Sequence, residues 1–317
     1  MKLSSFCAVV ALISLSAMRA GDSPKPPLKI TPGKVVVPTD RMKRIWGELV
    51  HLDLKTRTGS FRAESSNEIM KFAVLPYAEL LHHATFGDLQ DFRVGERAIF
   101  RLHENEKGEW VWLTYIQDEM NFLFGHKEYY HVDKIDAERG RLECTDANSD
   151  LTYIRKKGIL IDTDSQTRYW KLEKQATFAA VKVGDKLRTQ THGNGKGETR
   201  VAWEVFLDEA SILKFQSEQK AVHAKRMRVE GLPAYVNLSA DNELRITLFL
   251  EAREQTAKLK PGQKIRVAPA GIDRASSSAP VNGTISAVKG NDVTIVGAPS
   301  VAVFTPTGLS RLWIDAE

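Results

Sequence analysis

The side chains best equipped for chemistry occur in two copies of one segment. Each copy holds a histidine, a lysine four positions later and an adjacent Asp-Glu pair at its end. These residues are His103, Lys107 and Asp118-Glu119 in the first copy, and His192, Lys196 and Asp208-Glu209 in the second. A Val-Gly turn precedes each histidine, and Gly95 and Gly184 both lie eight positions before it. A spacing kept in two places indicates a duplicated structural module.

Paired carboxylates can act as a general acid and a general base when both reach one reacting atom. Asp118 and Glu119 are neighbours at the end of an apolar run, where a strand is expected. Successive side chains of a strand point to opposite faces, so the two carboxylates are not expected to meet. We therefore interpret both Asp-Glu pairs as polar strand ends.

The segments around His103 and His192 are rich in Asn and Gly, as hairpin turns require. A turn is the simpler interpretation of this pattern. In the alternative, the two turns are ligand-binding loops that display His103 with Lys107 and His192 with Lys196.

Several histidines near the first copy suggest a metal site as a second alternative. These are His82, His83, His103, His126 and His131. Neutral imidazoles with the thioether of Met120 would suit copper. However, we expect His82 and His83 on a short helix, where neighbouring side chains diverge. We therefore predict no metal ligands and no cofactor.

The stretch 110–130 is unusually aromatic. Alternation places Trp110 and Trp112 on one face of a strand that also carries Tyr115. The two indoles could stack on sugars or bases as a binding platform. The other interpretation, which we favour, is that the aromatic side chains fill the interface between the first and second modules.

Nucleophile elbows, phosphate-binding glycine loops, His-Glu-x-x-His pairs and Cys-x-x-Cys pairs are all lacking in the sequence. These motifs define the common hydrolase, nucleotide-binding and metalloprotease sites. We therefore expect a protein that is not an enzyme.

The elements that position these residues are mostly short alternating strands. In the first module, strands are expected near residues 46–54, 60–63, 69–75, 98–102 and 110–116, with a short helix at 77–84. Three strands, a helix and two strands is the order of an OB-type barrel, a five-stranded Greek-key barrel. The fold class is therefore mainly β, with tandem small OB-like barrels, short helices and one longer linking helix.

The chain also resembles the small OB-like modules of unknown function found in exported bacterial proteins. Such modules open with a Gly-x-Val-x-x-Val-Asp-like hairpin, which Gly47-Glu-Leu49 and Leu52-Asp53 match. They also carry an Asp-Leu-x-Val-Gly-Asp-like turn, which the segment from Asp88 to Glu96 matches. The resemblance implies a fold and no active site.

The same plan recurs along the chain. A second module begins with strands near residues 132–136, 142–145 and 151–161, the last interrupted at 156–158. A helix of about four turns at 210–227 follows, with apolar residues at nearly helical spacing. We expect a leader at 1–20, a Pro-rich tether at 21–40, OB-like modules at 41–127 and 128–225, and a degenerate third barrel at 226–317.

The N-terminus has the character of a secretory signal peptide, with Lys2, an apolar run at 6–17 and small residues at Ala20-Gly21. We expect export to the periplasm or the medium and no transmembrane segment after the leader is removed. The mature chain would keep Cys144 as its one cysteine, so no internal disulfide is expected.

The net charge is +5, from 45 Lys and Arg against 40 Asp and Glu, and the leader holds Lys2 and Arg19. The basic residues are spread over all three modules, so no specific nucleic-acid binding is expected. We predict a non-catalytic binding or scaffolding protein of the cell envelope, whose partner is a protein or a polysaccharide. A periplasmic copper-type metal-binding protein, and a binder of polysaccharides or single-strand polyanions, are the alternatives.

Overall fold

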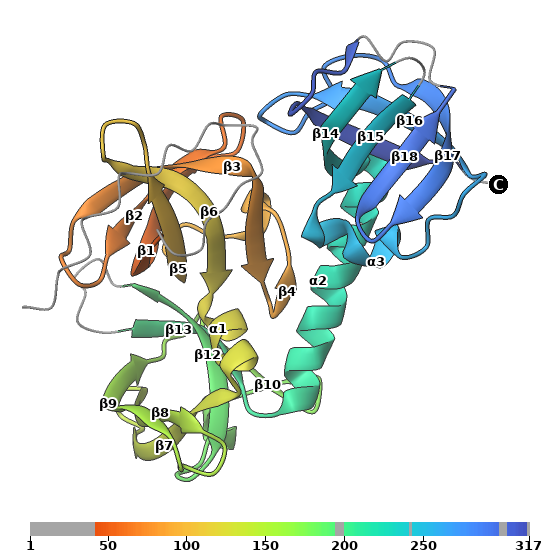
Figure 1. Ribbon diagram of the computed structural model, residues 1–317. Coiled ribbons are helices and arrows are strands. Elements are labelled where there is room, and N and C mark those ends of the chain that lie inside the picture. Colours follow the sequence, from red (N-terminus) through yellow and green to blue (C-terminus); the bar gives the residue numbers. More distant parts are fainter. Residues whose placement is uncertain (1–41, 194–199, 241–242, 298–302, 316–317) are drawn as a thin grey trace, which may run out of the picture.

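The computed structural model describes residues 42–193, 200–240, 243–297 and 303–315. Within these ranges the chain folds into three small β-barrels, which two helices join (Figure 1). The mainly β fold class with tandem small barrels is confirmed. The expected leader at 1–20 and tether at 21–40 lie outside the described residues. In the part that is described, no helix combines the length and the apolar character needed to cross a bilayer.

Barrel 1 has the strand order of an OB-type barrel. Its strands are β1 (Lys43–Asp53), β2 (Thr58–Ala63), β3 (Ile69–His82), β5 (Arg97–Glu104) and β6 (Trp110–Asp118). β1 pairs with β2 and β5, β2 pairs with β3, and β3 closes the barrel by pairing in parallel with β6. Phe61 and Phe100 stack in the core with ring centroids 4.0 Å apart.

Barrel 2 repeats this order after the short helix α1 (Glu119–His126). Its strands are β7 (Glu128–Asp136), β8 (Arg141–Asn148), β9 (Ile154–Asp162), β12 (Lys186–Gly193) and β13 (Arg200–Phe206). β9 and β13 form the parallel pair that closes the barrel. The buried Cys144 lies in its apolar core.

The connection between the third and fourth strands is a hairpin in both barrels, where a helix was expected in the first. Barrel 1 has β4 (Thr85–Phe86) and the 3₁₀ turn η2 (Leu89–Asp91), and barrel 2 has β10 (Arg168–Lys171), β11 (Lys174–Ala176) and η3 (Phe178–Ala180).

The prediction of a helix at 77–84 is wrong, because β3 continues to His82. Pro76 is compatible with the first turn of a helix. It lies instead in the irregularity of the β3–β6 register between Val74 and Glu79, where a residue without an amide hydrogen is tolerated.

Barrel 3 is closed but follows another order. Its strands are β14 (Leu232–Ala240), β15 (Glu243–Leu248), β16 (Lys264–Ala270), β17 (Val281–Lys289), β18 (Asp292–Val296) and β19 (Leu309–Ile314), with η4 (Leu250–Ala252) and α3 (Arg253–Thr256) after β15. They close in the order β14-β15-β18-β17-β16-β19, with every pairing antiparallel. The third barrel therefore has six strands and no parallel closing pair.

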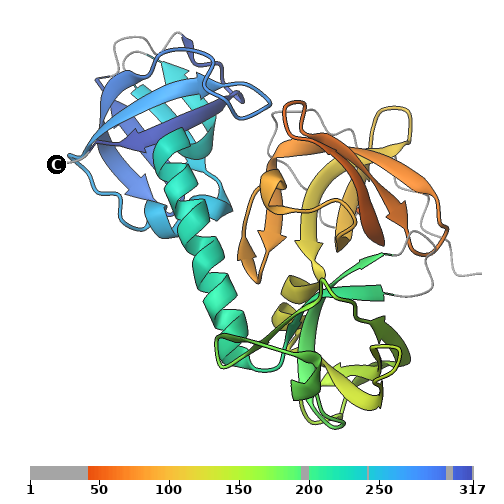
Figure 2. The ribbon, with the colours of Figure 1, turned by 180° about the vertical axis from the view of Figure 1, so that it is seen from behind.

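The linking helix α2 (Glu209–Glu230) runs from barrel 2 past barrel 1 to barrel 3, as Figure 2 shows from behind. It is longer than the predicted 210–227. Its buried side includes Ile212, Gln219, His223 and Met227, whereas Leu213 and Val222 are about half exposed. Gln216 donates to the carbonyl of Ala84, and Arg226 forms an ion pair of 2.8 Å with Asp91. Through these contacts α2 also binds barrel 1.

One turn is built in the same way in all three barrels. Its glycines have φ values of +94°, +90° and +87°, at Gly95, Gly184 and Gly262. Each glycine amide donates to a carbonyl of a bulged strand, and the residue after the glycine accepts a bond in return. The acceptor carbonyls belong to Leu49, Val132 and Ile285. The glycines thus occupy a left-handed conformation that other residues resist.

The positive φ of the shared turn predicts that two glycine-to-alanine substitutions differ in their effect on stability. A methyl group at Gly184 meets open space, so Gly184→Ala would destabilise the fold by about 1 kcal/mol through backbone strain alone. Gly125 in α1 also faces open space and has no positive φ, so Gly125→Ala is the control and would be neutral or stabilising. Urea unfolding of the two variants measures the difference; equal midpoints would contradict the strain argument.

Candidate functional site: the cleft between barrels 1 and 2

The duplicated Asp-Glu pairs mark the points where a strand passes into a helix. Asp118 ends β6 and caps α1, because its Oδ1 accepts from the amide of Asn121 at 2.6 Å. Asp208 caps α2 in the same way through the amide of Ser211 at 2.8 Å. Short side chains that accept bonds from the first helical amides stabilise such starts. The aspartate of each pair is therefore a helix cap, and Asp118 is also the end of β6, whereas β13 ends at Phe206.

Glu119 is fully buried and holds the two barrels together. Its Oε1 accepts from Nη1 of Arg97 at 2.7 Å and from the hydroxyl of Tyr130 at 2.6 Å. Its Oε2 accepts from the amide of Thr191 at 3.1 Å and from the Thr191 hydroxyl. Arg97 belongs to barrel 1, whereas Tyr130 and Thr191 belong to barrel 2. A buried carboxylate needs partners of this kind.

Beside this contact lies a cleft of about 460 Å³. Barrel 1 contributes β1, β2, the turn after β2 and the start of β5; barrel 2 contributes β9 and the near ends of β12 and β13. The charged side chains that line it are Arg62, Arg97, Lys156, Arg200, Glu48 and Glu64. Four cationic groups thus face two carboxylates.

These cationic groups differ in how they are paired. Arg97 binds Glu64 with two nitrogens, and burial would raise the pKa of Glu64, but the Arg97 guanidinium holds it below its usual value. Arg200 donates to the hydroxyl of Tyr130 at 2.8 Å and lies 3.3 Å from Glu119. Arg62 and Lys156 form no ion pair with any described residue, and the Arg62 Nε is buried without a hydrogen-bond partner there. These two side chains are the cations available to a ligand.

The cleft occupies the part of an OB barrel that commonly binds ligands. OB-folds bind oligonucleotides and oligosaccharides against their second and third strands, next to the loop between the fourth and fifth. In barrel 2 those elements are β8, β9 and the β12–β13 connection. Lys156 lies on β9, and His192 and Arg200 lie at the described ends of that connection.

The predicted loop residues separate into two environments. His192 lines the cleft and stacks on Trp203 with ring centroids 4.7 Å apart. His103 is fully buried, faces Trp112 across the β5–β6 pair, and has a pKa lowered by burial. Lys107 is exposed in the turn between these strands, away from the cleft lining. Lys196 lies outside the described residues.

The aromatic stretch does not form one platform. An irregularity in the β5–β6 register separates the two indoles. Trp110 packs against the core of barrel 1, and Trp112 packs against the cluster of Leu75, Tyr77, Phe249 and Leu309. Tyr115 lies under the Arg101 guanidinium, 3.9 Å from the ring centroid, and donates to Gln117 at 2.7 Å.

Because Phe249 and Leu309 belong to barrel 3 and its connections, Trp112 contributes to the contact between barrels 1 and 3. The expectation that both tryptophans fill the interface of the first two modules is wrong. That interface is filled by Phe122 of α1 and Trp46 of β1, whose ring centroids are 5.0 Å apart.

The histidines expected near the first module do not form one group. His126 contacts the carbonyl of Phe122 at 2.8 Å, His131 contacts that of Asn148 at 2.8 Å, and Met120 packs with Phe206 and Ile212. His82 and His83 do come together, with ring centroids 3.9 Å apart, and Asp118 lies beside them. The expectation that they diverge on a helix is wrong, because they lie at a hairpin.

Charge around these two histidines is uneven. Burial would lower the pKa of His82, but the carboxylates of Glu96 and Asp118 raise it to about 9. Burial lowers the pKa of His83 well below its usual value, and the charges of His82 and two nearby arginines lower it further. Burial raises the pKa of Asp118 to about 6.

The position of Trp112 predicts a loss of stability. Trp112→Ala would cost roughly 1–3 kcal/mol, less than a fully buried tryptophan, because the ring is only partly buried. The variant would also loosen barrel 3 from barrel 1, which small-angle scattering detects as a larger radius of gyration. An unchanged unfolding midpoint together with an unchanged radius would contradict this assignment.

Substitution of Glu119 is expected to destabilise the protein more than substitution of Trp112. Glu119→Ala would leave the Arg97 guanidinium with one carboxylate fewer in a buried site, at a cost of about 3–5 kcal/mol. Glu143 forms an exposed pair with Lys134, so Glu143→Ala is the control and would cost at most about 1 kcal/mol. Guanidinium unfolding compares the two; similar losses would show that Glu119 does not hold the barrels together.

Comparison with known proteins identifies no family for this chain. No protein-family model and no curated protein matches the chain. Among solved structures, drosophila Unr CSD456 aligns at 11% identity over 80% of this chain and 94% of its own, with a TM-score of 0.19. A luciferin-regenerating enzyme aligns at 11% identity over 85% and 91%, with a TM-score of 0.10. Likenesses this weak carry no argument, and the assignment of OB-type barrels rests on the strand pairings of this chain.

Proposed function

We propose that the protein is a non-catalytic binding protein of the cell envelope, and that it binds an acidic, extended polymer in the cleft between barrels 1 and 2. The observation that carries the proposal is the pair Arg62 and Lys156. Both line the cleft, and neither forms an ion pair with a described residue. The other two cations of the cleft, Arg97 and Arg200, already have carboxylate partners.

The surroundings of the pair support an anionic ligand. Glu64 is bound by Arg97 and forms no ion pair with Arg62 or Lys156. The buried Nε of Arg62 lacks a partner among the described residues, and such a donor gains free energy when a carboxylate or sulfate oxygen reaches it. Glu48 remains in the lining and would oppose an anion close to Gly193.

The class of polymer follows from what the cleft offers. It supplies charge and a stacked histidine–tryptophan pair at its edge, but the tryptophan pair considered as a stacking platform faces elsewhere. Recognition would therefore depend on the spacing of charges rather than on stacked bases. An acidic polysaccharide fits this requirement, and it fits the expected export of the chain.

A comparison of two double variants that lose the same charge tests the proposal. The double variant Arg62→Ala, Lys156→Ala would weaken binding of a sulfated heparin oligosaccharide at least tenfold. The slope of log K against log salt would fall by roughly 1–2, since two charge contacts are lost. Isothermal titration at several salt concentrations gives both quantities, with oligo(dT) and neutral dextran as further probes.

The control variant removes the same charge elsewhere. Lys258 and Lys289 are exposed in barrel 3 and do not line the cleft, so Lys258→Ala, Lys289→Ala would bind like the parent. Equal weakening in both double variants would show that only the overall charge matters. Preference for oligo(dT) over the sulfated oligosaccharide would replace the polysaccharide with a single-stranded nucleic acid.

A further inference from the structure

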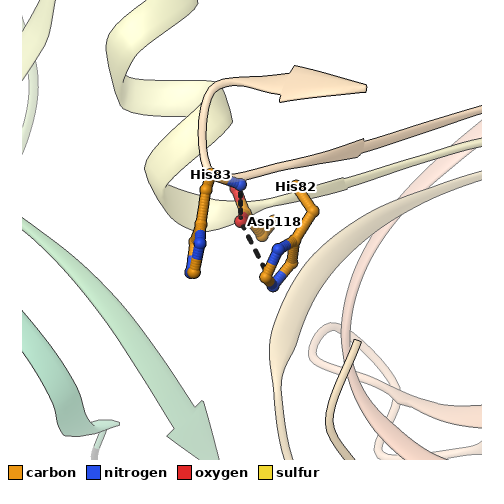
Figure 3. A group of neighbouring side chains, drawn as sticks. All are labelled: His82, His83 and Asp118. Carbon is orange, nitrogen blue, oxygen red and sulfur yellow. Dashed lines mark hydrogen bonds and ion pairs between the residues drawn. The ribbon is translucent and has the colours of Figure 1, made fainter. Parts of the chain in front are cut away.

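His82, His83 and Asp118 converge at a place that the proposed polymer cleft does not use. His82 ends β3, His83 begins the hairpin to β4, and Asp118 lies where β6 passes into α1 (Figure 3). One ligand atom from each residue lies within 4.8 Å of the others. The Nε2 atom of His82 is 3.9 Å from Oδ2 of Asp118. The group lacks a cysteine, and its donors are two imidazoles and a carboxylate.

The hairpin that brings the two rings together has a strained backbone conformation. Leu81 pairs with Phe86 and His82 with Thr85, so His83 and Ala84 form a two-residue turn. Their φ values are +48° and +62°, in the left-handed region that such turns usually fill with Asn and Gly. Strain of this kind gathers at functional sites and persists only where the surroundings impose it.

The carboxylate of Asp118 is held in place by two amides. Its Oδ1 accepts from Asn121 at 2.6 Å, and its Oδ2 accepts from the amide of His83 at 2.7 Å. Oδ2 also faces Nε2 of His82, as Figure 3 shows. Asp118 is therefore fixed with one oxygen directed between the two histidines, as a metal ligand would be.

A buried carboxylate oxygen beside His82 lacks a hydrogen-bond partner among the described residues. It is Oε1 of Glu96, a residue only 1% exposed. Oε1 of Glu96 lies 3.4 Å from Nε2 of His82. Buried polar atoms without partners are rare in folded proteins, and coordination of a metal ion is one way to satisfy them.

We propose that His82, His83 and Asp118 form a site for a divalent transition metal ion, with Zn²⁺ as the best fit. Zinc–nitrogen distances of about 2.0–2.1 Å in a tetrahedral site place neighbouring ligand atoms about 3.4 Å apart. The ligand atoms of the group lie up to 4.8 Å apart, so binding of the ion would draw the side chains together. Two imidazoles and a carboxylate suit zinc, and Glu96 lies close enough to supply a fourth ligand.

The position of the site indicates what the ion would do. The ring of His83 packs edge-on against Phe215 of α2, with centroids 5.3 Å apart. An ion bound here would tie the β3–β4 hairpin to the end of β6 and to the start of α1. It would therefore stabilise the part of barrel 1 that α2 contacts, which is a structural role.

Metal binding by the full chain, with affinity tags removed and after dialysis against a chelator, tests the proposal. One equivalent of Zn²⁺ would bind by isothermal titration, and Co²⁺ would give the intense visible absorption of a tetrahedral site. Zn²⁺ would also raise the unfolding temperature, because an ion that binds only the folded state stabilises it. A Co²⁺ spectrum typical of six oxygen ligands, or no saturable binding, would overturn the proposal.

Three variants assign the ligands. His83→Ala and Asp118→Asn would each weaken Zn²⁺ binding at least about a hundredfold, since even indirect supports of a metal site are worth 10- to 100-fold. Asparagine keeps the helix cap but loses the bond from the amide of His83, so circular dichroism would first establish that the Asp118→Asn protein is folded. His126→Ala is the control, because His126 is an exposed histidine of the neighbouring helix outside the group. If folded His83→Ala and Asp118→Asn proteins bind Zn²⁺ like the parent, the cluster is an ion pair between His82 and its carboxylates.

Discussion

The glycine turn that precedes the fourth strand of barrels 1 and 2, and the third strand of barrel 3, is the constraint on which the barrels depend. In barrel 1, Gly95 donates to Leu49 at 2.6 Å and Leu49 donates back to Glu96 at 2.8 Å. The same exchange joins Gly184 and Asp185 to Val132, and Gly262 and Gln263 to Ile285. Each acceptor strand has a bulge at this point, which gives the exchange room. Because one residue of positive φ sets where two strands meet, the register of each barrel follows from this turn.

A second constraint decides how the first two barrels are placed. Glu119 follows the last strand of barrel 1 and reaches Tyr130 and Thr191 of barrel 2, while Arg97 reaches it from barrel 1. The chain between the barrels is only the short helix α1, so the start of that helix fixes the distance between them. The cleft opens beside this contact, and Arg97 serves both, since it also holds Glu64 in the cleft wall. The geometry of the cleft, and with it the proposed ligand site, therefore depends on the contact between the two barrels.

Alternation and turn chemistry were sufficient to predict most strands of the two OB-type barrels and the role of Gly95 and Gly184. They could not predict the hairpin at His83 and Ala84, because neither residue favours positive φ and the local sequence lacks the Asn and Gly residues typical of such turns. Nor could they place Trp112, since a register irregularity in β6 changes what it faces. Arg62 and Lys156 gave no signal at all. They are ordinary surface cations in the sequence, and only the docking of two barrels brings them into one cleft.

Among the described residues, the candidate metal site belongs to barrel 1 alone, and the repeated turn helps to explain why. The residue after the glycine is Glu96, Asp185 or Gln263, and in each barrel its side chain accepts a bond from the amide three residues earlier. Glu96 makes that bond with Oε2, which leaves Oε1 to face His82. Asp185 and Gln263 make the same bond, yet neither barrel 2 nor barrel 3 has a group of three potential metal ligands among its described residues. The turn itself is structural in all three barrels, and in barrel 1 it also places a carboxylate oxygen beside the end of β3, where the proposed ligands His82 and His83 lie.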